Sequence, residues 1–316
     1  MQRWRCRDCR HVWLTSGPRR ERSAQRAYTR SSAGRQTLAD LARSTGKSER
    51  TLRRQFDKLA PATGTVAVSQ APVALAFDAT YFGRGYGLMI YRAEGRTIHW
   101  QEIASETLAV VEAGLRRLLE QGWHFSSITI DGRKGVISLI TRLLPGVPLQ
   151  LCLFHQKAII RRYLTSKPKT RCGQELRELT MFLGDVPGHI FRECLADIKA
   201  RFADFLKERN EQGQFKHRRI RSALRSLTVN APWLFTAQNH PDRDIPTTTN
   251  SCDGSFAHWK AKVKIHRGLR KDRRSKTIRF LLSNPESKPH LFVHYASDHG
   301  TMIKRLPQGG PFRLSH

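Results

Sequence analysis

Two aspartates in this sequence directly follow apolar segments, and their carboxylates are suited to binding divalent metal ions. Asp78 comes after the run 73–77, and Asp131 comes after the run 127–130. An ionised carboxylate at the end of an apolar strand is costly to bury unless it is solvated, paired or bound to metal. If the two strands are neighbours, the carboxylates converge at one sheet edge. There a pair of Mg²⁺ ions would relieve their repulsion and serve phosphodiester chemistry. The alternative is that each aspartate caps the next turn or helix.

The charge of the chain indicates a polyanionic partner. The sequence has 56 Lys and Arg against 26 Asp and Glu, a formal net charge of +30 at pH 7. Such an excess opposes compaction by self-repulsion. Nucleic acid is the leading candidate, because Lys and Arg release counterions when they neutralise phosphates. A basic surface that has no partner is the alternative.

The sequence gives no sign of a membrane partner. No stretch approaches the roughly 20 apolar residues that span a bilayer, and we find no secretory signal or lipidation motif. Six cysteines in 316 residues do not make a disulfide scaffold. Reduced thiols in the cytoplasm are therefore expected.

The elements that would position these aspartates begin at about residue 71. Apolar runs and one amphipathic stripe predict strands near 73–77, 87–91, 97–101, 127–130 and 148–151, with a helix over 107–121. Strands followed by alternating helix and strand predict an α/β fold with a mixed sheet covered by helices. Residues 174–236 are predicted to be helical throughout.

A very basic region precedes this part of the chain. Residues 1–60 hold 16 Lys and Arg against 5 Asp and Glu. A helical pattern over 37–43, a glycine, and a second helix capped by Ser48 predict a helix-turn-helix. Arg50, Arg53 and Arg54 lie on the early turns of the second helix, which enters the major groove in such motifs. A plain pair of helices with a solvated basic face is the alternative.

Four short motifs occur in a fixed order along the chain. They are Phe77-Asp78-Ala79-Thr80, Ile130-Asp131-Gly132, Cys152-Leu153-Phe154-His155-Gln156 and Thr248-Thr249-Asn250-Ser251-Cys252-Asp253-Gly254. The set resembles the Mutator-like family of bacterial insertion-sequence DDE transposases, in the variant with an N-terminal zinc ribbon. The resemblance covers nearly the whole chain, and it implies a cytoplasmic protein associated with the bacterial nucleoid. It implies an RNase H-like core with an all-helical insertion between the second and third acidic residues.

The resemblance also implies a set of metal ligands. Asp78 and Asp131 would be the first two ligands of two Mg²⁺ (or Mn²⁺) ions. The third acidic residue in such families is usually Glu, in the pattern Thr-Thr-Asn-x-x-Glu-Gly, and Asp253 stands at that position here. Because Asp is one methylene shorter, its helix must approach the metals more closely. We predict Asp253 as the third ligand; a drifted, inactive copy is the alternative.

The family carries a Cys-x-x-His after the second acidic residue, and Cys152 and His155 match it. Two ligands cannot complete a four-coordinate zinc site. We therefore predict a structural role for this pair near the active site, with metal ligation as the alternative.

A second pair, Cys6 and Cys9, resembles the second half of a zinc ribbon. The first Cys-x-x-Cys should lie upstream, and the sequence has no upstream residues, so either the start is assigned too late or the ribbon is truncated. His11 would supply a third ligand and still leave a Zn²⁺ site incomplete.

A basic run follows Asp253 closely, and Lys260, Lys264 and Arg267 are its predicted DNA contacts. On a helix and its trailing loop, these cations would lie beside the metal site, where the scissile phosphate must bind. A solvated charged face is the alternative.

Together these features predict an enzyme that binds the terminal inverted repeats of its own element. It would cleave DNA with two metal ions and join the freed 3′-OH to target DNA, as a homo-oligomer. The expected parts are a truncated zinc-ribbon half at 1–16, a helix-turn-helix region at 20–60, a catalytic domain at 71–290 with a helical insertion at 174–236, and a C-terminal tail at 291–316. A catalytically decayed transposase that regulates by binding DNA, and a metal nuclease without strand transfer, are the alternatives.

Overall fold

The computed structural model of the chain describes residues 3–14, 17–34, 36–59, 66–266 and 268–283. The described residues form two compact units. Among the described residues, the head unit comprises those that precede Ala67 and those from Gly254 onward, and the sheet unit comprises those from Ala67 to Asp253. The limits predicted for the domains stay predictions.

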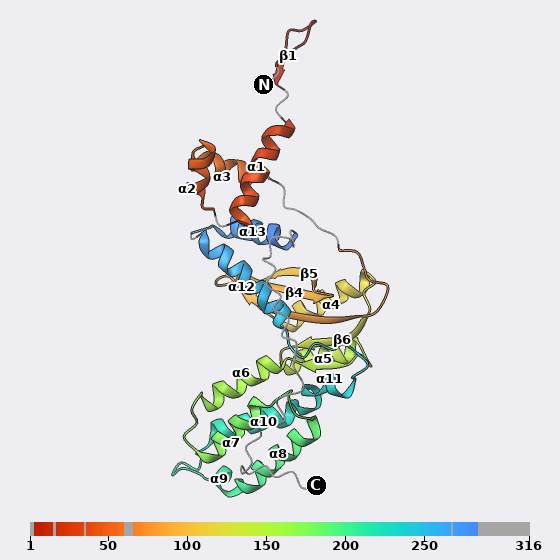
Figure 1. Cartoon of the computed structure of the whole chain (residues 1–316), viewed down its shortest axis with the longest axis vertical. Helices are drawn as coiled ribbons and strands as arrows, with labels where there is room; N and C mark the ends of the chain where they lie inside the picture. The colour runs from red at the N-terminus through yellow and green to blue at the C-terminus, as the bar shows by residue number, and fades with distance from the viewer. Residues whose placement is uncertain (1–2, 15–16, 35, 60–65, 267, 284–316) are drawn as a thin grey trace, which may run out of the picture. The chain divides into compact units, whose positions relative to one another are not determined.

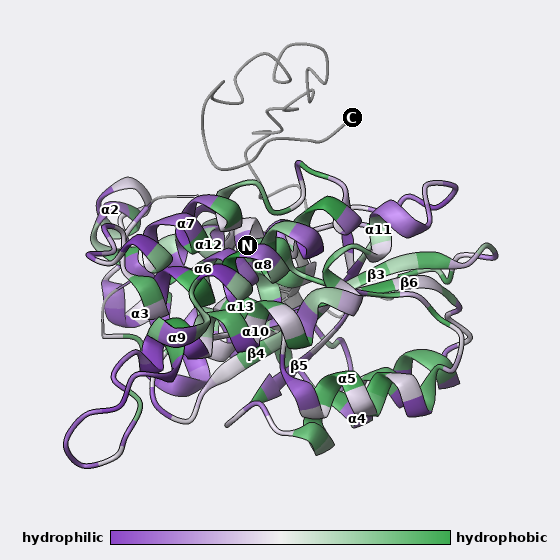
Figure 2. Cartoon of the chain, turned by 90° about the horizontal axis from the view of Figure 1, so that it is seen from below, coloured by the Kyte–Doolittle hydropathy of each residue, from purple (hydrophilic) through white to green (hydrophobic). Residues whose placement is uncertain are grey.

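A five-stranded mixed sheet is the centre of the sheet unit. Its strands are β3 (Val73–Tyr81), β4 (Gly87–Ala93), β5 (Arg96–Ile103), β6 (Phe125–Ile130) and β7 (Leu149–Leu151), in the order β5-β4-β3-β6-β7. The pairs β5-β4 and β4-β3 are antiparallel, while β3-β6 and β6-β7 are parallel. Figure 1 shows this sheet, and Figure 2 shows the hydrophobic character of β3 and β6. The predicted α/β class is confirmed, and the sheet is compatible with an RNase H-like core.

One amphipathic helix follows the antiparallel strands, and a second follows β6. Helix α4 (Leu108–Glu120) begins at Thr107, whose hydroxyl accepts the Val110 N–H, and its residues Val111, Leu115 and Leu118 are fully buried. Helix α5 (Lys134–Leu143) likewise buries one apolar stripe. The predicted helix over 107–121 is therefore confirmed.

The expected strand end at Phe77 is wrong. Strand β3 continues to Tyr81, because antiparallel β4 satisfies its backbone groups from Ala76 as far as the pair Tyr81–Gly87. Asp78 therefore lies inside β3, opposite Ile90 of β4. By contrast, β6 ends at Ile130, so Asp131 directly follows its strand as predicted.

Helices make up the rest of the sheet unit, and Figure 1 shows α6 to α10 gathered together. They are α6 (Leu153–Leu164), α7 (Arg171–Met181), α8 (Gly188–Arg201), α9 (Ala203–Lys207), α10 (Arg218–Leu234) and α11 (Thr236–Asn239). Buried Gln150 of β7 donates to Leu234 O of α10 at 3.0 Å, which ties these helices to the sheet. The expectation that 174–236 is helical throughout is wrong. The chain turns through Gly213 at φ 71° and forms a bridge between Arg209 and Phe215.

The head unit combines N-terminal and C-terminal segments. Its elements are β1 (Arg3–Arg5), β2 (Val12–Leu14), α1 (Gly17–Ser32), α2 (Leu38–Thr45), α3 (Glu49–Lys58), α13 (Lys271–Ser283) and the larger part of α12 (Asn250–Ile265). Between α2 and α3, Gly46 is left-handed at φ 66°, and the Ser48 hydroxyl accepts the Thr51 N–H. The core of the unit includes Tyr28 of α1, Phe56 of α3 and Phe280 of α13.

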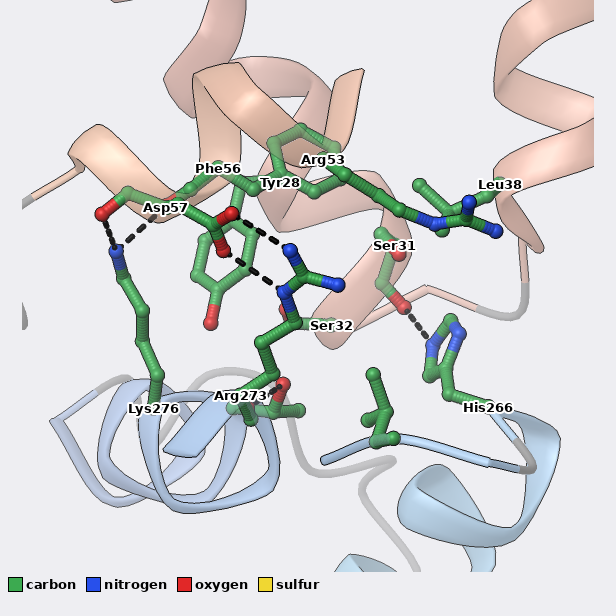
Figure 3. Close-up of a pocket in the computed structure, with 12 residues that line it drawn as sticks. Tyr28, Ser31, Ser32, Leu38, Arg53, Phe56, Asp57, His266, Arg273 and Lys276 are labelled. Atoms are coloured by element: carbon green, nitrogen blue, oxygen red, sulfur yellow. Dashed lines mark hydrogen bonds and ion pairs between the residues drawn. The ribbon is translucent and has the colours of Figure 1, made fainter. Parts of the chain in front are cut away.

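Several cations of the basic run after Asp253 hold the head unit together. Arg273 donates to both carboxylate oxygens of Asp57, at 2.9 and 2.7 Å. Lys276 donates to Asp57 O at 3.0 Å, and His266 Nε2 donates to Ser31 O at 2.8 Å. Figure 3 shows Arg273 and Lys276 on either side of Asp57. These cations therefore have a structural role that the local sequence pattern did not indicate.

Candidate metal centre

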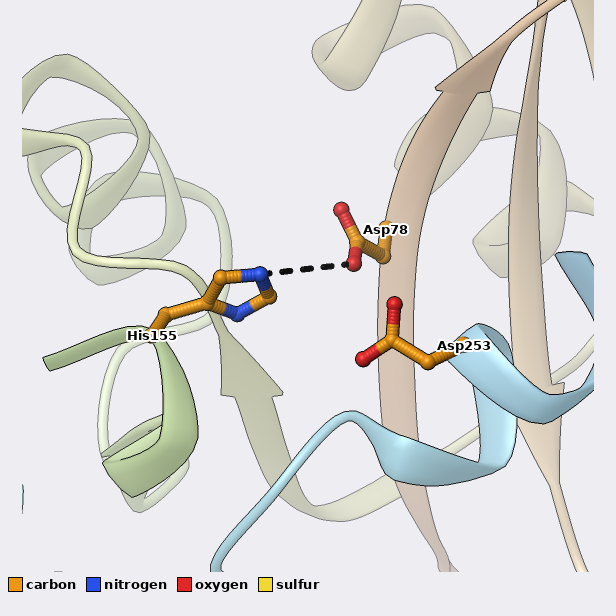
Figure 4. Close-up of side chains that lie close together, drawn as sticks. All are labelled: Asp78, His155 and Asp253. Atoms are coloured by element: carbon orange, nitrogen blue, oxygen red, sulfur yellow. Dashed lines mark ion pairs between the residues drawn. The ribbon is translucent and has the colours of Figure 1, made fainter. Parts of the chain in front are cut away.

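Three side chains from separate elements converge in the sheet unit. Asp78 comes from β3, His155 from the first turn of α6, and Asp253 from the first turn of α12, and they point toward one another in Figure 4. One ligand atom of each lies within 4.8 Å of the others. Among the residues that the structure describes, this is the only group of three or more His, Cys, Asp and Glu with that spacing.

Asp78 lies where β3 extends past its pairing with β6. The parallel pairing of β3 with β6 ends at Ala76–Thr129, and β3 then continues beside β4 alone. Beyond Ala76 the β6 side of the strand is therefore open to other elements. Asp78 Oδ2 lies 4.0 Å from His155 Nε2 there.

Asp131 lies beside this group but not within it. It follows β6, the parallel neighbour of β3, and its negative charge contributes to raising the pKa of Asp78. Burial raises the pKa of Asp131 itself, and the charge of Glu106 raises it further. Glu106 is held by Arg133 in an ion pair of 2.8 Å. The structure thus brings Asp78 and Asp253 together with His155, and leaves the Asp131 carboxylate outside the three-residue group.

The two clustered carboxylates fit a cation. The Asp78 side chain is only 14% exposed, and burial raises its pKa to about 7. The Ala79 N–H, which donates to Oδ1 at 2.7 Å, and the charge of His155 both oppose that rise. Asp253 Oδ2 is buried and has no hydrogen-bond partner among the described residues. Buried anionic oxygens of this kind are normally paired or bound to metal.

The donor set favours a divalent ion without selecting one. Carboxylates suit Mg²⁺ and Mn²⁺, whereas imidazole is a common ligand of Zn²⁺ and Fe²⁺. Asp78, Asp253 and His155 together offer both types of ligand atom. The residues present are therefore compatible with the use of a divalent metal.

His155 lies closer to the carboxylates than the sequence indicated. The sequence predicts a structural role for Cys152 and His155 near the active site, with metal ligation as the alternative, and His155 lies within the group of potential ligands. Cys152 is 1% exposed and precedes α6. Hydrogen bonding with Cys152 raises the pKa of His155 to about 9, and the charges of Asp78 and Asp253 act in the same direction. Burial raises the pKa of Cys152, but its hydrogen bonds with His155 and Thr249 outweigh burial and hold that pKa below its usual value.

The N-terminal cysteines occupy the turn of a small hairpin. Cys6 and Cys9 lie between β1 and β2, and Cys6 N–H donates to His11 O at 2.9 Å. Hydrogen bonds from the backbone of Cys9 and Asp8 lower the pKa of the Cys6 thiol. These residues do not form a three-ligand group in the described structure, and zinc binding here stays a prediction.

The predicted DNA contacts lie on two helices of the head unit. Arg50, Arg53 and Arg54 are exposed on α3, where Arg53 forms an ion pair of 2.7 Å with Glu49. Lys260 and Lys264 are exposed on α12. Arg267 and the predicted tail at 291–316 fall outside the described residues.

Comparisons with known proteins add little to this description. No family model and no curated protein matches the chain. Among solved structures it is similar to the Drosophila P element transposase strand transfer complex, at 14% sequence identity over 84% of this chain and 78% of that one. The TM-score of 0.30 is too low to support an argument about function. None of the described helices combines the length and the apolar character needed to cross a membrane.

Proposed function

We propose that this protein is a metal-dependent DNA transposase of the DDE type. It binds the ends of a mobile element, cleaves phosphodiester bonds there, and joins the freed 3′-OH ends to target DNA. The observation that carries the proposal is the convergence of Asp78, His155 and Asp253, with a buried Asp253 oxygen that has no hydrogen-bond partner among the described residues. The net charge of +30 and the ordered motifs shared with Mutator-like transposases support it.

Within this proposal the carboxylates have distinct positions. Asp78 and Asp253 would hold the metal ions from β3 and α12, and Asp131 would contribute from the adjacent strand end. Bound there, two Mg²⁺ or Mn²⁺ ions would supply Lewis-acid chemistry for an in-line displacement at phosphorus. Water is the first nucleophile and the freed 3′-OH the second, so no covalent link between protein and DNA forms.

The remaining parts of the chain have roles in holding DNA. Helices α2 and α3 act as a helix-turn-helix, with the exposed arginines of α3 facing the inverted repeat. Helices α7 to α11 are the insertion in an RNase H-like core. Lys260 and Lys264 contact DNA phosphates, and two or more copies of the chain join a pair of ends.

The test is a cleavage and strand-transfer assay with the full-length protein. The substrate is labelled DNA taken from the segments that flank the coding sequence, incubated with Mg²⁺, with Mn²⁺ or with EDTA. Nicks at a defined position and joined products, both dependent on metal, would support the proposal. Nicking without joining would indicate a nuclease. Tight, sequence-specific binding with no cleavage under any metal would contradict the proposal and favour a DNA-binding regulator.

Replacing Arg50, Arg53 and Arg54 together with Ala is expected to weaken binding to the element ends. The plot of log affinity against log salt concentration has a negative slope. Each lost phosphate contact should make that slope less steep by about 0.9. A lost base contact should also reduce the preference for end DNA over unrelated DNA, by about 1–3 kcal/mol. Fluorescence anisotropy with both DNAs over a salt series measures the two effects.

A control of equal charge is available on the sheet unit. Arg96, Arg116 and Arg117 are exposed there, with side-chain exposures of 44%, 58% and 60%. Their combined replacement with Ala should leave the preference for end DNA unchanged. An equal loss of preference in this control would show that α3 does not read the DNA sequence.

A further inference from the structure

Thr249 makes contacts in three directions from a fully buried position just before the first turn of α12. Its backbone N–H donates to Cys152 Sγ at 3.3 Å. Its hydroxyl oxygen lies 3.5 Å from Cys152 Sγ and 3.4 Å from His155 Nδ1. Its carbonyl accepts the N–H of Cys252 at 2.8 Å and that of Asp253 at 3.3 Å.

We propose that Thr249 is the positioning residue of the metal centre. Through its hydroxyl it fixes the ring of His155, and through its carbonyl it fixes the helical turn that carries Asp253. Contacts between the Cys-x-x-His and Thr-Thr-Asn motifs then hold the two potential ligands, His155 and Asp253, close together. This inference rests on the metal centre of the proposed function, but not on DNA cleavage or joining.

The hydrogen-bond directions support this role. A threonine hydroxyl has one hydrogen to donate and can accept others. His155 also hydrogen-bonds with Cys152. If Thr249 donates to Cys152 Sγ, its own oxygen is available as a further partner that accepts the Nδ1–H of His155. The other ring nitrogen, Nε2, is then the one that faces Asp78, and it lies 4.0 Å from Asp78 Oδ2. A hydrogen bond at one ring nitrogen commonly sets the tautomer and orientation with which a histidine binds metal at the other.

The segment that carries Thr249 is held in place by other bonds as well. Thr129 Oγ1 donates to Pro246 O at 2.6 Å, and Leu153 N–H donates to Thr247 O at 3.0 Å. Neither bond involves the Thr249 side chain. Removal of the Thr249 hydroxyl alone should therefore leave the segment attached and disturb mainly the His155 ring.

The variant Thr249→Val tests the hydroxyl because valine keeps the shape of the side chain. Mn²⁺ binding to the full chain, without DNA, is measured by calorimetry and by electron paramagnetic resonance of the unbound ion. Loss of a hydrogen bond that orients a ligand typically weakens metal affinity by about 10–100-fold, and we expect Thr249→Val to fall in that range. Thr249→Ser, which retains the hydroxyl, should restore affinity close to that of the wild type.

Two further variants make the result specific. Thr248→Val, at the neighbouring half-buried position, is the matched control and should bind Mn²⁺ as the wild type does. Asp78→Asn should abolish the Mn²⁺ binding that Thr249→Val weakens. This result would show that the Mn²⁺ ion binds at the centre formed by Asp78, His155 and Asp253. A merely structural role for Thr249 would lower the melting temperature of Thr249→Val without changing its Mn²⁺ affinity, and that outcome would overturn the proposal.

A measurement on the wild type covers the case in which Thr249→Val does not fold. Nitrogen-15 spectra of the histidine-labelled protein loaded with Mg²⁺, with His155 assigned by its loss in His155→Gln, should show the hydrogen on Nδ1. A hydrogen on Nε2 would overturn the proposal, as would a wild type that binds no Mn²⁺. If the wild type binds Mn²⁺ and Thr249→Val binds it weakly, but neither cuts DNA, the proposed function fails while the role of Thr249 stands.

Discussion

Replacing Asp78, Asp131 or Asp253 with asparagine should lower metal-dependent cleavage and strand transfer by about 10³-fold while DNA binding persists. Asparagine keeps the size of the side chain and removes the negative charge that holds a divalent cation. The loss is expected in both steps for Asp78 and Asp253, whose oxygens lie within the 4.8 Å group, and for Asp131, which follows the adjacent strand. Single-turnover assays with labelled end DNA measure cleavage, and fluorescence anisotropy measures binding.

The same series separates the three aspartates from one another. Asp131 lies outside the group of Asp78, His155 and Asp253, so activity that survives Asp131→Asn would restrict the centre to those three residues. Activity that survives Asp253→Asn would place the third acidic ligand elsewhere in the chain. Asp244 is an exposed acidic residue of the sheet unit, and Asp244→Asn is the control that should behave as the wild type.

Local patterns in the sequence predict much of the sheet unit. The apolar runs give all five strands of the sheet, and Thr107 marks the start of α4 because its hydroxyl caps the helix. Asp131 could be placed at a strand end because β6 stops where its apolar residues stop. In each case the residues that determine the element lie within it or directly beside it.

Contacts between residues far apart in the sequence account for the features that local patterns do not predict. Asp78 lies inside β3 because β4, not the strand's own residues, sets where β3 ends. His155 faces the carboxylates beside Thr249, from which it is separated by 94 positions. Arg273 belongs to the head unit through Asp57, which lies 216 positions away. No local periodicity indicates such pairings, so the sequence does not predict that residues of the basic run after Asp253 also stabilise the head unit.

Asp78→Asn is also expected to stabilise the metal-free protein, although the same substitution should lower the proposed activity. Burial raises the pKa of Asp78 from 3.8 to about 7 in the folded chain. Between these two values the folded state retains a proton that the unfolded state has released, so the free energy of unfolding falls as the pH rises. Each unit of pKa difference corresponds to about 1.4 kcal/mol, which makes the cost of ionised Asp78 about 4 kcal/mol at pH 8. Asparagine removes this cost and still accepts the Ala79 N–H through its amide oxygen.

The measurement is urea unfolding in EDTA, followed by tryptophan fluorescence, since Trp123 of the sheet unit is 1% exposed. The advantage of Asp78→Asn over the wild type should approach its maximum at pH 8 and shrink to below about 2 kcal/mol at pH 5, where folded wild-type Asp78 is protonated. Saturating Mg²⁺ should stabilise the wild type and not the variant, because a ligand that binds only the folded state adds to its stability. Equal or lower stability of Asp78→Asn at pH 8 would mean that the attraction of His155 for Asp78 exceeds the cost of burial. The stability difference between Asp78→Asn and the wild type in EDTA measures the free energy that ionised Asp78 costs the metal-free fold. A bound cation would offset this cost, which is the property expected of a metal ligand.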